Sequence, residues 1–249
     1  MQNSGHDLSR YAAMVQSLAR HAIDIAVDAT PHKPREGQRV FSLIEMLPAA
    51  RQRLGESGLT ITAPPVEADV DFTDGRGHSR PIYRCLAFHL AASAGAPATP
   101  QWSTDEEDVS LTLWREVVSP STDTFSKIEA IANTCDSSLH EQALDDGIDF
   151  WTYREMVGVH ALHLLAQRYQ REDWQQRVVE ITNYHQHHTQ PDYTTYQPWG
   201  LAAFLSNPDT IMFGEQQLHD VQTHLQIEGG AGAVLPALLL ADAYASLKS

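Results

Sequence analysis

The sequence is poor in cysteine and in basic residues, and both shortages exclude classes of protein. Its two cysteines, Cys85 and Cys135, have no CxxC spacing, which favours buried or free thiols over a zinc knuckle or a disulfide framework. Seventeen Lys and Arg against 32 Asp and Glu give a formal charge of -15, which repels phosphate backbones and anionic lipid surfaces. The basic residues are also scattered. We therefore expect no nucleic-acid partner.

Long apolar runs and nucleotide-binding loops are also missing. No run of about 18 apolar residues occurs, so no membrane span is expected. The first 15 residues lack the basic start and the apolar stretch of a secretory signal, which favours a cytoplasmic protein. The sequence contains no GxGxxG, P-loop or GxSxG motif, and this disfavours dinucleotide, NTP and α/β-hydrolase chemistry. We expect no cofactor.

The remaining composition is that of a globular protein. The chain has 249 residues, 42% hydrophobic and 20% charged, which predicts a single domain over 1–249 with a well-buried core. Apolar residues recur at helical spacing almost throughout, so the predicted fold class is all-α. The exception is 58–72, where side chains alternate but Pro64 and Pro65 prevent a central strand.

The helical spacing can be divided into segments by turn and capping signals. We expect helices at 7–28, 37–54, 80–94, 105–118, 124–135, 137–146, 150–169, 172–188, 198–206, 211–226 and 231–247. Pro48 should kink the second of these, and Pro198 suits the first turn of its helix. From residue 150 onward the pattern predicts stacked helical hairpins, whereas 55–79 is an irregular insertion.

The segment 150–169 is apolar nearly all round, as expected for an interior helix, yet it carries one polar stripe. Tyr153, His160, His163 and Gln167 fall within a sector of about 80°, together with Met156. A polar stripe on an interior helix needs either buried partners or a cavity to face. Both interpretations remain open at the level of sequence.

The last helix poses the same question with one residue. Asp242 shares an arc with Leu235 and Leu238, so it is either a buried carboxylate with a partner or the exposed end of the helix. An exposed carboxylate is the simpler interpretation.

Three segments together resemble the α/α toroid proteins, such as terpenoid cyclases, protein prenyltransferases and polysaccharide lyases. They are "VGVHALHLLAQRY", "YTTYQPWGLAAFL" and "GAGAVLPALLLADAYASL", within 150–247. The resemblance implies inner helices around a central cavity and outer helices packed against them. It does not extend to cyclase motifs, because DxDD is absent and "DDGID" at 145–149 has the wrong spacing for DDxxD.

Two acidic loops are candidate sites. "VDFTDGRGHSRP" at 70–81 gathers Asp71, Asp74, Arg76, His78 and Arg80, which could bind an anionic group and move a proton. A turn followed by an N-cap serine accounts for the same residues. "DDGIDF" at 145–150, which contains Asp146, could hold a cation or supply an acid/base pair. Acids favoured by the dipole of the next helix are the simpler explanation.

The segment "HQHHTQPDYTTYQPWG" at 185–200 contains three histidines. His185 and His188 continue the apolar face of the preceding helix and His187 points away, so the three cannot bind one ion from a regular helix. No HExxH motif or third ligand is present, and we expect no metal site. The loop that follows predicts a pocket rim. Its candidate residues are Asp192, Tyr193, Tyr196 and Trp199.

These observations favour an enzyme with a central pocket that runs acid/base chemistry on a small organic or sugar-like substrate, an elimination, a cyclisation or a hydrolysis. His160 or His163 is the predicted base and Tyr153 an alternative proton donor, with a carboxylate partner from Asp71, Asp74 or Asp146. Predicted substrate contacts are Arg76, His78, Gln167 and the pocket rim. The alternative is a non-catalytic helical scaffold that binds a partner protein, as a homo- or hetero-oligomer.

Overall fold

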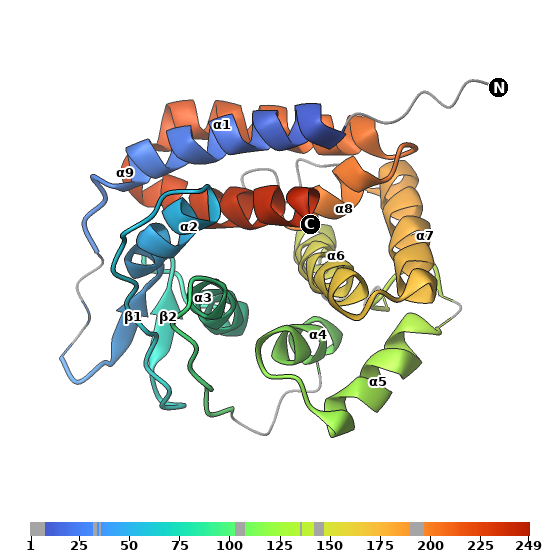
Figure 1. Cartoon of the computed structure of the whole chain (residues 1–249), viewed down its shortest axis with the longest axis horizontal. Coiled ribbons are helices and arrows are strands. Elements are labelled where there is room, and N and C mark those ends of the chain that lie inside the picture. Colours follow the sequence, from blue (N-terminus) through green and yellow to red (C-terminus); the bar gives the residue numbers. More distant parts are fainter. Residues whose placement is uncertain are drawn as a thin grey trace.

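The computed structural model describes residues 8–31, 34, 36–102, 108–134, 136–141, 147–189 and 197–249. The chain is mostly helical, with 66% helix and 3% strand, so the all-α prediction is confirmed (Figure 1). The elements are α1 (Leu8–Ala26), β1 (Val40–Ser42), a 3-10 helix η1 (Leu43–Met46), α2 (Leu47–Arg53), β2 (Asp71–Thr73), α3 (Pro81–Ser93), α4 (Val109–Val118), α5 (Thr122–Ala132), α6 (Ile148–Tyr169), α7 (Glu172–His188), α8 (Leu201–Ser206) and α9 (Ile211–Lys248).

Helix α9 is the main core helix of the fold. Its second half is buried continuously from Gly232 to Tyr244, and α9 as a whole packs against α1, α2 and α8. The two long helices α1 and α9 lie side by side (Figure 1). Gly229 has φ 65 and ψ -163, so α9 is two helices that meet at a kink. This agrees with the separate segments expected at 211–226 and 231–247.

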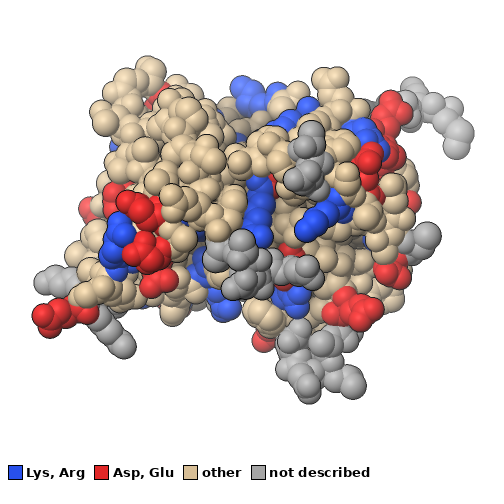
Figure 2. Space-filling model, turned by 90° about the horizontal axis from the view of Figure 1, so that it is seen from below, with Lys and Arg blue, Asp and Glu red and all other residues tan. Residues whose placement is uncertain are grey.

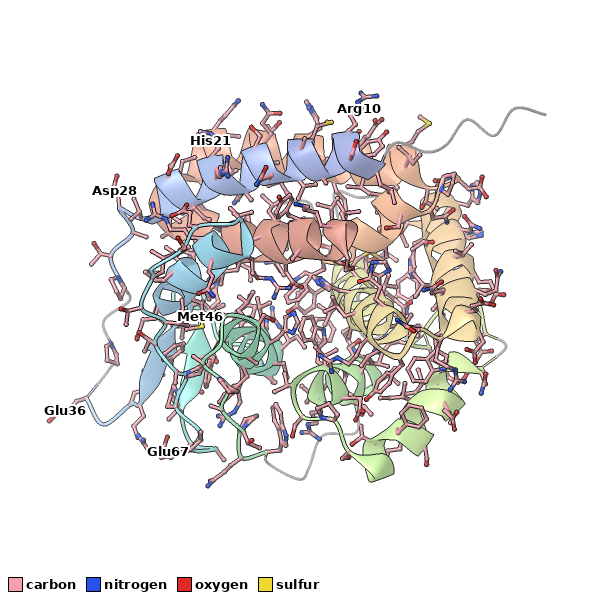
Figure 3. All side chains as sticks on the ribbon, in the orientation of Figure 1. Arg10, His21, Asp28, Glu36, Met46 and Glu67 are labelled. Carbon is pink, nitrogen blue, oxygen red and sulfur yellow. The ribbon has the colours of Figure 1, made fainter. Side chains whose placement is uncertain are left out.

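By length and composition alone, α9 could cross a membrane. Core helices of globular proteins pass the same test, and 72% of its apolar window is buried inside the protein. Side chains fill the space between α9 and the central helices, whereas Arg10 and His21 project from the outer side of α1 (Figure 3).

Three central helices, α3, α4 and α6, pack beneath α9, with α4 between the other two. Each has a local reason to begin where it does. Pro81 stands in the first turn of α3. The Asp108 carboxylate caps α4 by accepting a hydrogen bond from Leu111 N at 2.9 Å. Gly147, at φ 55, precedes α6 in a backbone conformation that suits glycine.

The predicted helix at 37–54 is wrong in its first half. Val40–Ser42 forms a short strand that pairs in parallel with Asp71–Thr73, and the 3-10 helix follows. Pro48 lies in the first turn of α2, where its missing N–H costs nothing, so it begins a helix and does not kink one. Pro198 precedes α8, because Gly200 at φ 71 sets the start of that helix at Leu201.

The predicted helix at 137–146 is also wrong over its described part, because residues 136–140 form bends. The backbone N–H groups of Leu139 and His140 donate to the Glu155 carboxylate at 3.0 and 2.5 Å. The buried Glu155 carboxylate on α6 thus accepts hydrogen bonds from backbone N–H groups that a helix would have used internally, and the segment 136–140 folds around this carboxylate. Residues 142–146 lie outside the described residues.

Candidate functional site

A cavity of about 540 Å³ opens where α3, α4 and α6 begin. Its wall contains Arg80, Asp108, Ser110, Phe150, Tyr153 and Arg154. The first turn of a helix leaves backbone N–H groups without intrahelical acceptors and carries a partial positive charge. Helices that begin at one cavity make it a suitable place for an anion, although the Asp108 carboxylate already occupies part of the first turn of α4.

The two arginines of the cavity have different surroundings. Arg154 is paired with Asp108, with its Nε 2.9 Å from a carboxylate oxygen. In the described part of the chain, Arg80 has no ion-pair partner, and its guanidinium lies 5.6 Å from the ring centre of Tyr153 and 5.9 Å from that of Phe150. Stacking on rings leaves the edge of the guanidinium available as a donor. The cavity therefore has a cation to offer a ligand, although the chain as a whole carries a charge of -15.

The charge of the surface is correspondingly uneven. Lysine and arginine side chains gather near the middle of one face, and acidic side chains lie mainly toward its edges (Figure 2). An excess of acids over the whole sequence thus does not preclude local attraction of an anion.

Tyr153 contributes a hydroxyl to this region that has no hydrogen-bond partner among the described residues, although the atom is buried. Burial raises the pKa of Tyr153 well above its ordinary value, so the hydroxyl keeps its proton at neutral pH. A buried donor without an acceptor is costly, and such groups commonly mark the position of a ligand or water. Tyr153 was predicted from the polar stripe, and it is the stripe residue that reaches the cavity.

Ser110, His140 and Glu155 form a hydrogen-bonded row at the cavity wall. Ser110 Oγ lies 3.1 Å from His140 Nε2, and His140 Nδ1 lies 2.7 Å from Glu155 Oε1. Ser110 Oγ also donates to the backbone oxygen of Arg154 at 2.7 Å. The row joins the first turn of α4, the 136–141 segment and α6, with the serine at the cavity.

Glu155 is fully buried and fixes the histidine at the centre of the row. It accepts from His185 Nε2 at 2.8 Å in addition to His140 and two backbone N–H groups. Burial alone would raise the pKa of Glu155, but the hydrogen bonds from His140 and His185 lower it to about 2. Burial would likewise lower the pKa of His140, but Asp108 and Glu155 more than offset this and raise it. Asp108 Oδ2 lies 3.8 Å from His140 Nε2.

A second buried polar cluster lies deeper, at the crossing of α2, α3, α6 and α9. Asp242 Oδ1 accepts from Arg53 and from His89 Nε2, the latter at 2.9 Å, and Oδ2 accepts from His160 Nε2 at 2.8 Å. Asp242 is fully buried, so the expectation of an exposed carboxylate is wrong. Burial opposes its ionisation, but the charges of Arg53 and His89 and the bond to His160 hold the pKa of Asp242 well below its usual range.

Two tryptophans stand against His160. Its ring centre is 5.3 Å from that of Trp114 and 5.5 Å from that of Trp199, and Trp199 also contacts Tyr153. Trp199 is fully buried and so does not form a rim, contrary to prediction. His160 does not reach the cavity wall. Its carboxylate partner is Asp242, not Asp71 or Asp74.

The rest of the polar stripe faces protein. His163 is buried and its Nε2 has no partner among the described residues; burial, and then the charge of His160, lower its pKa to about 4. Gln167 is bonded to Ser246 through both ends of its amide, at 3.1 and 2.7 Å, so it is not a substrate contact of the cavity. The stripe therefore has buried partners for His160 and Gln167 and a cavity for Tyr153.

The predicted 70–81 site is not part of the cavity except at its end, Arg80 and Pro81. Asp71 is exposed and accepts from Gln38. Asp74 is buried and holds its own turn by accepting from the backbone N–H of Arg76 and of His78, and from the His78 ring at 3.2 Å. The Arg76 guanidinium pairs with Glu228 on α9 at 2.7 Å. The turn interpretation thus accounts for the contacts of Asp74 and His78, whereas Arg76 ties the loop to α9.

Four predicted residues, Asp146, Asp192, Tyr193 and Tyr196, lie outside the described residues. Of the three histidines, His185 is buried as expected, whereas both His187 and His188 are exposed, so His188 does not continue the apolar face. Sequence reasoning missed Asp108, Ser110, His140, Arg154 and Glu155. The available signal was Glu155, a charged residue on the interior helix outside its polar stripe.

Within the residues that the structure describes, no group of three or more His, Cys, Asp and Glu is placed to hold a metal ion. No family model, curated protein or solved structure matches the chain.

Proposed function

We propose that the chain is an enzyme that binds a small organic anion in the cavity at the starts of α3, α4 and α6. The observation that carries the proposal is that three helix N-termini, the Arg80 guanidinium and the Tyr153 hydroxyl meet at one cavity of about 540 Å³. In the described part of the chain, Arg80 has no ion-pair partner and the Tyr153 hydroxyl has no hydrogen-bond partner. The volume lies within the range of small-molecule sites. A sugar acid or a similar carboxylate has the size and charge to match.

The reaction in this proposal is acid/base chemistry, an elimination, a cyclisation or a hydrolysis. Arg80 and the helix ends bind the anionic group and stabilise negative charge that develops on the substrate. Tyr153, which keeps its proton, serves as a donor. His140 takes the role of base that the sequence suggested for His160 or His163, since it borders the cavity through Ser110.

The architecture and setting are part of the same proposal. Helices that begin at one cavity support an α/α-toroid arrangement within a single domain, although stacked hairpins account for α6 and α7 equally well. We propose a cytoplasmic protein that requires no cofactor. A protein-binding scaffold has less support, because the most exposed apolar side chains among the described residues, Met212 and Ile227, lie fifteen positions apart on α9.

Calorimetric titration tests the proposal. The panel contains simple carboxylates, sugar acids, phosphate monoesters and the neutral sugars that match the acids in size. We expect anions to bind and the neutral sugars not to bind. Arg80→Gln should weaken binding about tenfold, the equivalent of about 1.4 kcal/mol.

The matched control is Arg39→Gln, since Arg39 is an exposed arginine paired with Asp69 away from the cavity. It should leave the affinity unchanged. Equal binding of anions and neutral sugars, or an equal effect of the two substitutions, contradicts the proposal. Mass measurement in solution, with and without ligand, tests the scaffold alternative, which requires a stable partner or a second copy.

A further inference from the structure

We propose that Ser110 is a nucleophile, activated by His140 and positioned for acyl transfer to or from an anionic ester in the cavity. The inference rests on the proposed function, because the ester is held by the same cavity. It adds a covalent step and names the substrate class, an ester or thioester of a small organic acid that carries a further negative charge.

The order of atoms in the row is the order that serine activation requires. Glu155 accepts the Nδ1 proton of His140 at 2.7 Å, which leaves Nε2, 3.1 Å from Ser110 Oγ, as the basic nitrogen of the neutral ring. Glu155 is itself held by Leu139 N, His140 N and His185 Nε2, so the imidazole has one tautomer and one orientation. Such a row is identified by its geometry and not by a sequence motif.

The location of the serine adds a second element of the chemistry. Ser110 follows the Asp108 cap and the first residue of α4, so it stands in the first turn, where backbone N–H groups point out of the helix. The first-turn N–H groups that are not bonded to Asp108, together with Arg80, can stabilise an oxyanion on the attacked carbonyl. A histidine-bonded serine at a helix N-terminus and at a cavity wall has the nucleophile, base and oxyanion donors together.

The covalent step balances with water as the co-reactant. Ser110 Oγ attacks the carbonyl carbon while its proton passes to His140 Nε2. The bond from the carbonyl carbon to the leaving oxygen or sulfur then breaks, and the leaving group takes that proton. Water attacks the acyl-serine, gives its proton to His140, and releases the acid as Oγ recovers a proton.

The resting hydrogen bonds predict when this step is available. Ser110 Oγ donates to Arg154 O at 2.7 Å, so in the resting state Nε2 is the donor to Oγ and His140 is an imidazolium. Charged groups face it from two helices, Asp108 from α4 and Glu155 from α6, and Arg154 and His185 pair with these. Reaction at Ser110 therefore requires loss of the Nε2 proton and should increase with pH.

Labelling of the whole chain with a fluorophosphonate tests the proposal. We expect one adduct by intact mass, placed on Ser110 by peptide sequencing, at a rate that rises with pH. Ser110→Ala should remove the adduct. Ser93→Ala should not, although Ser93 also sits in a helix and donates to a backbone oxygen, that of His89 at 2.7 Å. Because the wild-type adduct is located directly, the test stands even if Ser110→Ala fails to fold.

Glu155 is a positioning residue, and its test is the pH profile. Removal of the carboxylate that favours the imidazolium in Glu155→Gln should move the midpoint of labelling to lower pH, an effect that loss of packing alone does not produce. Anion binding without an adduct, or an adduct at another serine, would show that Ser110 is not the nucleophile and would leave the proposed function standing. Failure of folded wild-type protein to bind any anion contradicts the proposed function itself.

Discussion

Acidification should destabilise the fold through His163, which is buried with no partner for its Nε2 among the described residues. Burial, and then the charge of His160, lower the pKa of His163 from 6.5 to about 4. His163 therefore binds a proton near pH 6.5 in the unfolded chain, but only near pH 4 in the folded chain. Since the unfolded state binds more protons in this window, the free energy of unfolding falls as the pH falls.

The size of the effect follows from the shift. One pKa unit corresponds to about 1.36 kcal/mol, so a difference of about 2.5 units gives a loss of about 3 kcal/mol between pH 7.5 and pH 4. His163→Leu removes the titrating group and fills the site with an apolar side chain. The variant should gain about 3 kcal/mol relative to wild type as the pH is lowered through this window.

Urea unfolding followed by circular dichroism, at half-unit steps from pH 4 to pH 7.5, measures the difference. The control is His21→Leu, because His21 is exposed on the outer side of α1 (Figure 3). The His21 variant should keep the wild-type dependence on pH, since other groups titrate in both proteins alike. If His163→Leu and wild type lose stability in parallel, then His163 is not held neutral in the folded chain and the reasoning fails.

Two further substitutions test the buried contacts. Asp242→Asn leaves the charge of Arg53 without its counterion in the interior and should lower the free energy of unfolding in urea by about 3–5 kcal/mol. The control, Asp28→Asn on the surface, should lower it by under about 0.5 kcal/mol. Similar losses in the two variants would show that the Asp242 cluster does not stabilise the fold. Gly158→Ala places a methyl group 2.7 Å from Leu139 Cδ1 and 2.8 Å from Ser110 Oγ, and should cost about 1–3 kcal/mol. An unchanged melting temperature would contradict that packing.

The sequence predicted the helices from residue 150 onward because their apolar spacing is regular and their ends carry turn signals. The prediction failed at 37–54, because Pro48, which lies within the apolar spacing of a long helix, begins a short one. It also failed at 137–146, because the Glu155 carboxylate accepts hydrogen bonds from the backbone N–H groups of Leu139 and His140 that a helix would have used. Periodicity reports which side of a segment is buried, and it cannot report a contact with a charge elsewhere in the chain.

The candidate site shows the same limit. The polar stripe of one helix predicts Tyr153, His160 and His163 as site residues, yet only Tyr153 of these lines the cavity. The partner of His160 is Asp242, 82 positions further along the chain. The arc that Asp242 shares with Leu235 and Leu238 allowed both a buried and an exposed carboxylate and identified no partner. Ser110 and His140 carry no local motif, and their relation appears only when α4 and α6 pack together.

The most direct test of the central claim is a crystal structure grown with the anion that binds most tightly in calorimetry. We predict that its anionic group lies against the Arg80 guanidinium and the first turns of α3, α4 and α6, with the Tyr153 hydroxyl donating to it. An anion seated elsewhere on the molecule, with only water in the cavity, would contradict the account.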